Sequence, residues 1–98
     1  MNSVRAYELV MITRPELEEE AQIAVVDKFT GLIQNQGGTV ESVDKLGKRR
    51  LAYEIKGFHE GLYNVISFKA DQKVPRELDR VLKIADEVVK HMIVAKDE

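Results

Sequence analysis

The chain has 98 residues, of which 44% are hydrophobic and 33% charged, with a formal net charge of −2 and no cysteine. A chain of this length builds one hydrophobic core, so we expect a single domain over residues 1–98 with a short polar tail at 96–98. The absence of cysteine excludes disulfides, thiolate metal sites and a cysteine nucleophile. The near balance of charge excludes a protein that is basic over its whole surface, so a contact with nucleic acid has to be local.

The sequence also lacks the marks of a membrane or exported protein. No apolar run approaches the ~20 residues that cross a bilayer, and residues 1–7 have no apolar segment typical of a signal peptide. We therefore expect a cytoplasmic protein with no membrane partner.

The first predicted element is a strand over residues 4–13, which are rich in β-branched and apolar side chains. It ends before Pro15, because proline has no amide hydrogen to give to a sheet. Alternate residues of a strand point to opposite faces. One face is predicted to hold Tyr7, Leu9 and Met11, and the other Glu8, Val10 and Ile12.

A helix is predicted next, beginning at Pro15 and the glutamates within 16–20. Proline is tolerated in a first helical turn, and negative charge there complements the helix dipole. Over 23–33 apolar residues recur every three or four positions, which forms a stripe that packs on a sheet. The glycine pair at 37–38 then ends the helix, because glycine readily adopts the left-handed conformation.

Residues 39–55 are predicted to form one strand with a bulge at Gly47, because an isolated glycine in a strand pattern often marks a bulge. A turn over 57–61 leads into the second strand of the same hairpin at 62–70. The first of these strands is expected to anchor in the core through Leu51, Tyr53 and Ile55.

The last two predicted elements complete the fold. Pro75 and the apolar spacing of Leu78, Val81 and Leu82 indicate a shorter second helix, and residues 88–95 indicate the last strand. The order strand, helix, strand, strand, helix, strand is that of the ferredoxin-like split βαβ fold. We therefore expect an α+β domain in which two helices cover one face of a four-stranded antiparallel sheet of order 4-1-3-2.

The densest positive charge lies at the predicted bulge. Residues 44–50 hold four cationic residues and one acid, Asp44. Such a cluster favours a polyanion such as RNA, through contacts to phosphates. The alternative, an exposed strand edge whose charge deters aggregation, stays open on the residues alone. The candidate RNA-binding residues are Arg5, Lys45, Lys48, Arg49, Arg50 and Lys56.

No catalytic or metal site is predicted. The two histidines, His59 in a turn and His91 in a strand, lie far apart with no serine, cysteine or metal-ligand pattern nearby. The glycines at 37–38, 57 and 61 belong to a helix end and a hairpin turn, so they do not form a phosphate-binding motif. We expect no enzyme, no cofactor and no small-molecule substrate.

The same topology occurs in the RRM, which stacks RNA bases on aromatic residues of its third strand. In the corresponding segment 60–68, Glu60 stands where a basic residue is required, and only Tyr63 is available to stack. An RRM-like RNA binder is therefore the less favoured alternative.

The predicted strands do not alternate cleanly between apolar and polar residues, although an antiparallel sheet with one solvated face normally does. If Leu9, Ile66 and Ile93 face the core, an apolar patch gathers on the other face of the sheet, with Glu8 near its edge. The candidate partner-binding residues in this patch are Val10, Ile12, Tyr63, Val65, Lys90, Met92 and Val94.

Residues 47–56, G-K-R-R-L-A-Y-E-I-K, resemble the signature of the bacterial small-subunit ribosomal protein S-six family. The family pattern has glycine, a basic residue two positions later, and then leucine, a small residue, tyrosine, isoleucine and lysine at the places that this segment fills. The segments V-R-A-Y-E-L-V-M-I, R-P-E-L and D-E-V-V-K-H-M-I-V also look like family segments. The resemblance therefore covers nearly the whole chain.

The resemblance implies a ribosome-associated structural component of the bacterial small subunit and no enzyme. It further implies binding to ribosomal RNA of the central domain together with small-subunit ribosomal protein eighteen, which is then the partner for the apolar patch. On the residues alone, two alternatives remain, because one fold hosts many functions. One is a small regulatory or self-associating ferredoxin-like domain that binds a metabolite and uses the patch for a homodimer, and the other is an acylphosphatase-like enzyme.

Overall fold

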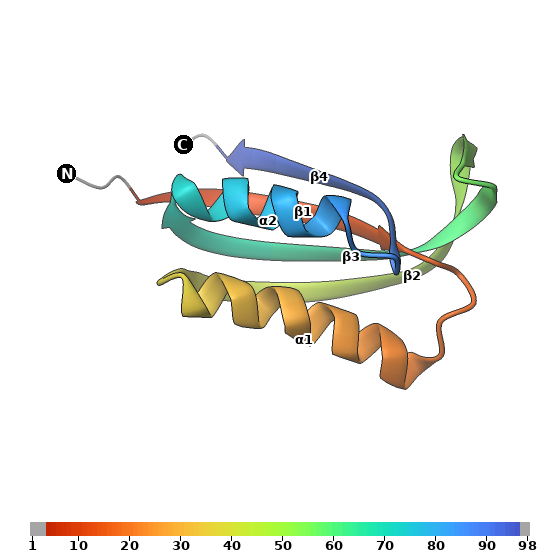
Figure 1. Cartoon of the computed structure of the whole chain (residues 1–98), viewed down its shortest axis with the longest axis horizontal. Helices are drawn as coiled ribbons and strands as arrows, with labels where there is room; N and C mark the ends of the chain where they lie inside the picture. The colour runs from red at the N-terminus through yellow and green to blue at the C-terminus, as the bar shows by residue number, and fades with distance from the viewer. Residues whose placement is uncertain (1–3, 97–98) are drawn as a thin grey trace.

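The computed structural model describes residues 4–96, in which four strands and two helices follow the predicted order (Figure 1). The antiparallel sheet has the order β2-β3-β1-β4, which confirms the ferredoxin-like fold and, read from its other edge, the predicted order 4-1-3-2. The elements are β1 (Val4–Thr13), α1 (Glu19–Asn35), β2 (Thr39–Ile55), β3 (Phe58–Asp71), α2 (Lys73–Lys83) and β4 (Val88–Lys96).

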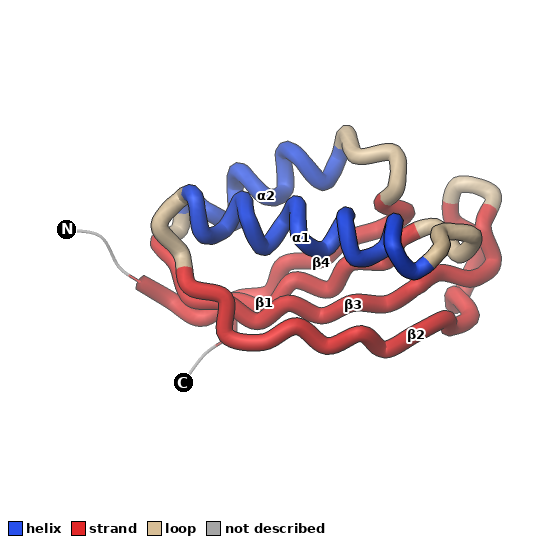
Figure 2. Tube along the Cα trace, turned by 90° about the horizontal axis from the view of Figure 1, so that it is seen from below, coloured by secondary structure: helices blue, strands red, loops and turns tan. Residues whose placement is uncertain are grey.

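Both helices lie on the same face of the sheet (Figure 2). The period of two in the central strands explains this arrangement, because it sends Leu9 of β1 and Ile66 and Phe68 of β3 to that face, where each is fully buried. Neither helix of the described chain is long and apolar enough to cross a membrane. From the helices, the core is closed by Val25, Val26, Phe29, Ile33, Val74, Leu78 and Leu82.

Strand β4 is one residue longer than predicted. It ends at Lys96, because Lys96 still pairs with Ala6 of β1. Lys96, predicted as the first residue of the polar tail at 96–98, therefore belongs to the sheet. Residues 97 and 98 lie outside the described part of the chain.

Helix α1 begins later than predicted, at Glu19 rather than at Pro15. Pro15 lies in the connection from β1, and long-range contacts hold this connection away from the helix. The amide of Arg14 donates to the carbonyl oxygen of Glu87 at 3.0 Å, and the Arg14 guanidinium lies 5.3 Å from the centroid of the Phe58 ring. The partners of Arg14 lie far along the chain, so a prediction from the local sequence cannot include these contacts. The prediction therefore places the start of the helix too early.

The turn of the β2–β3 hairpin is shorter than the predicted turn at 57–61. It consists of Lys56 and Gly57, whose φ angles are 53° and 84°. Two positive φ values in a two-residue loop are typical of a type I′ turn, whose twist matches that of the flanking strands. Strand β3 therefore begins at Phe58, and His59 lies in a strand rather than in a turn.

Gly61 occupies a position where a side chain does not fit. A Cβ atom there would overlap Cγ2 of Ile12 and would lie 3.2 Å from the carbonyl oxygen of Thr13. We expect Gly61→Ala to lower the free energy of unfolding by about 1 to 3 kcal/mol, because Ile12 has to leave a well-packed position. Urea denaturation followed by circular dichroism measures this change.

Gly31→Ala in α1 is the matched control, because nothing lies within 4 Å of the Cβ position of Gly31. Alanine there should leave the free energy of unfolding unchanged or raise it by up to about 1 kcal/mol, since glycine weakens a helix interior. Equal effects of the two substitutions would contradict the close contact between Gly61 and Ile12.

Candidate nucleic-acid interface and docking face

Cations of β2 and its turn form an exposed edge of the sheet. Strand β2 is an outer strand, and every residue from 41 to 50 is exposed. Because β1 pairs with β3 only as far as Leu62, the hairpin continues beyond the end of β1 and rises from one end of the sheet in Figure 1. We use the name cationic edge for Lys45, Lys48, Arg49, Arg50 and Lys56.

The bulge at Gly47 decides which way these cations point. Lys45 pairs with Asn64, and after the bulge Lys48 pairs with Leu62, a register shift that confirms the predicted bulge. Residues opposite each other in a ladder share one side of the sheet, and both Asn64 and Leu62 are buried on the side of the helices. Lys45 and Lys48 therefore lie on the same side, whereas a regular strand places residues three apart on opposite sides.

Arg49 and Arg50 place positive charge on opposite sides of the sheet at this edge. Arg50 pairs with Glu60 on the side of the helices, and Arg49 pairs with Gly61 on the other side. Within residues 4–96, no member of the cationic edge forms an ion pair. The edge therefore presents unpaired positive charge on both of its sides.

The structure does not bring Arg5 together with the cationic edge. Arg5 pairs with Ala70, whereas Lys48 pairs with Leu62, eight residues away along β3. At about 3.3 Å per residue this separation is roughly 26 Å. Of the six predicted RNA-binding residues, Arg5 is the one that lies at the other end of the sheet.

The sheet face away from the helices carries the predicted apolar patch. At its centre, Val10 of β1 lies between Val65 of β3 and Met92 of β4. Met92 and Val94 of the outer strand β4 are 51% and 44% exposed, so the apolar surface continues from Val10 to this edge of the sheet. We use the name open face for Val10, Ile12, Tyr63, Val65, Lys90, Met92 and Val94.

Ile12 contributes less accessible surface to the open face than predicted. It lies between Tyr63 and Lys90 in the row next to Val10, yet only 6% of it is exposed. The missing side chain of Gly61 explains this burial, because Ile12 fills the space that a Cβ atom there would need. Ile12 therefore forms part of the floor of a hollow of about 150 Å³ in the open face.

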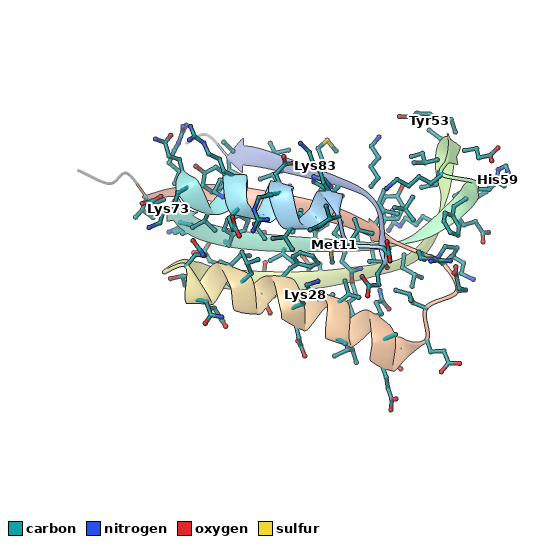
Figure 3. The ribbon with its side chains drawn as sticks, viewed as in Figure 1. Met11, Lys28, Tyr53, His59, Lys73 and Lys83 are labelled. Atoms are coloured by element: carbon teal, nitrogen blue, oxygen red, sulfur yellow. The ribbon has the colours of Figure 1, made fainter. Side chains whose placement is uncertain are left out.

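Tyr53 does not anchor in the core as predicted. It is 63% exposed, and its neighbours Leu51 and Ile55 are only half-buried. The hairpin, on which Figure 3 labels Tyr53, carries this side chain across to β4. There Nζ of Lys90 donates a hydrogen bond to Oη of Tyr53 at 3.2 Å and lies 5.4 Å from the ring centroid. The sequence gives no signal for this contact, which joins the hairpin to the open face.

His91 is more than a plain strand residue. Its Nε2 lies 2.7 Å from Oδ1 of Asp79, whose other carboxylate oxygen accepts a hydrogen bond from Nζ of Lys83 at 3.0 Å. The hydrogen bond with His91, and next that with Lys83, lowers the pKa of the Asp79 carboxyl. No three histidine or acidic side chains within residues 4–96 are grouped to hold a metal ion. The predicted candidate residues therefore fall on two surfaces, the cationic edge and the open face, with Arg5 apart from both.

The fold and these two surfaces define a small ferredoxin-like protein of the binding class, with charge on one edge and apolar surface on one face. Residues 6–95 match the family model of ribosomal protein S6. Small ribosomal subunit protein bS6 of Clostridium botulinum is 51% identical over 94 residues, which cover 96% of this chain and 100% of the relative. The bS6 protein of Heliobacterium modesticaldum is 50% identical over 95 residues, covering 97% and 99%.

A solved structure agrees with these sequence relatives. The crystal structure of 30S ribosomal protein S6 from Thermotoga maritima is similar with a TM-score of 0.89 and 30% identity, covering 96% of this chain and 89% of that chain. The chain therefore belongs to the ribosomal protein S6 family of the small ribosomal subunit. This confirms the predicted family, the structural rather than enzymatic class and the cytoplasmic, ribosome-associated location.

Proposed function

We propose that the chain binds ribosomal RNA of the central domain through the cationic edge, and that its open face binds small-subunit ribosomal protein eighteen at the same time. The observation that carries the proposal is the separation of positive charge from apolar surface within one sheet. Two partners that used one surface would displace each other, whereas these two surfaces can be occupied together.

The cationic edge suits phosphates better than bases. Arg49 and Arg50 lie on opposite sides of the edge, and a guanidinium can bind a phosphate through two parallel hydrogen bonds. Lys45 and Lys48 add compact charges on the side of the helices. An edge that is charged on both sides suits an RNA fold that approaches it from two directions, which supports recognition by shape and charge. The proposed contact does not include Arg5.

The open face suits a protein better than RNA bases. Tyr63 is the one aromatic residue among those that define this face, and it is half-buried beside aliphatic neighbours. Contiguous exposed aliphatic side chains are typical of protein docking sites. Glu8, which lies in the row that includes Val94, offers a basic partner one acidic contact on this face.

Replacing Arg49 and Arg50 by alanine should weaken binding to the ribosomal RNA in the presence of protein eighteen. Each lost phosphate contact reduces the slope of log affinity against log salt concentration by about one unit, so we expect a slope reduced by about two. Fluorescence anisotropy with labelled RNA over a series of salt concentrations measures both the affinity and the slope.

The matched control replaces Arg76 and Arg80 of α2 by alanine, which removes the same charge from the helix layer. This variant should keep the native slope. The assignment of the cationic edge to RNA is wrong if the Arg49 and Arg50 variant folds normally and retains both the native affinity and the native slope.

Replacing Val10 and Val65 by aspartate should abolish the complex with protein eighteen. These residues are opposite each other at the centre of the open face, so two carboxylates would be desolvated in the interface without a partner. Isothermal titration calorimetry measures binding, and circular dichroism tests whether the core beneath the helices remains folded.

Ile84→Asp is the control for this pair, because Ile84 is 73% exposed in the connection between α2 and β4, outside the open face. It should bind protein eighteen as the native chain does. A folded variant with aspartate at 10 and 65 that still binds protein eighteen with native affinity would show that the open face is not the docking surface.

A further inference from the structure

The two edges of the sheet differ in their capacity to accept another strand. Strand β2 has register shifts after Val40, Lys45 and Arg50 and is densely charged, and both features deter strand addition. Strand β4 pairs with β1 in unbroken register from Lys90 to Lys96. In the described chain no strand pairs with its outer side, and β4 runs along the outer margin of the sheet in Figure 1. Its outer backbone groups are therefore available for pairing.

A groove of about 400 Å³ lies beside β4 on the side of the helices. Ile93 and Ala95 make its β4 wall apolar, and Arg76 and Asp79 make its α2 wall polar. Asp79 is already bound by His91, whereas Arg76 forms no ion pair with any residue between 4 and 96. An exposed sheet edge beside a groove that can receive alternate side chains is an arrangement to which extended peptides add as a further strand.

The lysines of β4 determine which kind of added strand would pair favourably with this edge. Lys90 and Lys96 flank its regular part on the open-face side, with Met92 and Val94 between them. A second copy of this chain fits poorly, because antiparallel self-pairing centred on Ile93 would set Lys90 of each copy opposite Lys96 of the other. A strand with acidic ends and an apolar middle meets both lysines with opposite charge.

We propose that the β4 edge and the groove beside α2 bind an extended, acid-flanked peptide segment of a partner protein by strand addition. Carboxylates six positions apart face Lys90 and Lys96, with apolar residues between them against Met92 and Val94. The alternate residues of the segment face the groove. This binding goes beyond the proposed function, since it needs no RNA and uses the outer backbone of β4 and the groove, although it shares Lys90, Met92 and Val94 with the open face.

The test uses two blocked synthetic peptides, Glu-Thr-Val-Leu-Val-Thr-Glu and Lys-Thr-Val-Leu-Val-Thr-Lys, with the full chain. The acid-ended peptide should bind roughly tenfold more tightly, because two favourable cross-strand charge pairs replace two repulsive ones. In the variant with Lys90→Glu and Lys96→Glu, the preference should reverse. Calorimetry measures affinity, and amide hydrogen exchange should show new protection in β4, which general attraction between charges does not produce.

The matched control carries Lys28→Glu and Lys73→Glu, which changes the net charge equally on the helix layer. It should keep the preference of the native chain for the acid-ended peptide. The proposal is overturned if the acid-ended peptide does not bind, if both peptides bind equally, or if protection appears outside β4. Because neither RNA nor protein eighteen is present, these outcomes leave the proposed function untouched.

Discussion

The register of β1 against β3 determines which side chains form the core and which form the open face. Leu9 pairs with Ile66 toward the helices, whereas Val10 faces away from them. A slip of one residue would exchange these two sets, and both sets are largely apolar, so hydrophobicity alone separates them weakly. Glu8 and Ser67 add the missing signal, because they pair on the side of Val10 and favour solvent there.

Given this central pairing, the two outer strands acquire different properties. Strand β2 gains a bulge that sets Lys45 and Lys48 on one side, while Arg49 remains on the other. Strand β4 keeps a regular edge and adds exposed apolar side chains to the open face. The contact between Tyr53 and Lys90 joins the hairpin of β2 to β4 by one hydrogen bond and one cation–π contact.

Features with local signals are predictable from the sequence, and features that depend on distant contacts are not. The bounds of β1 and the bulge of β2 follow from alternation, Pro15 and an isolated glycine, and the family follows from residues 47–56. The start of α1 is missed because Arg14 bonds to Glu87, far along the chain. The exposure of Tyr53 is missed because alternation shows which face a residue takes, but not that the hairpin extends beyond its neighbours.

The separation of the RNA-binding and protein-binding surfaces is tested most directly by a two-step NMR titration of the isotope-labelled chain. Protein eighteen, added first, should change the amide signals of Val10, Val65 and Met92 and leave those of residues 48–50 unchanged. Ribosomal RNA, added second, should change the signals of 48–50 while the first set of changes persists. Changes at 48–50 in the first step, or loss of the open-face changes in the second, would contradict the separation of the two surfaces.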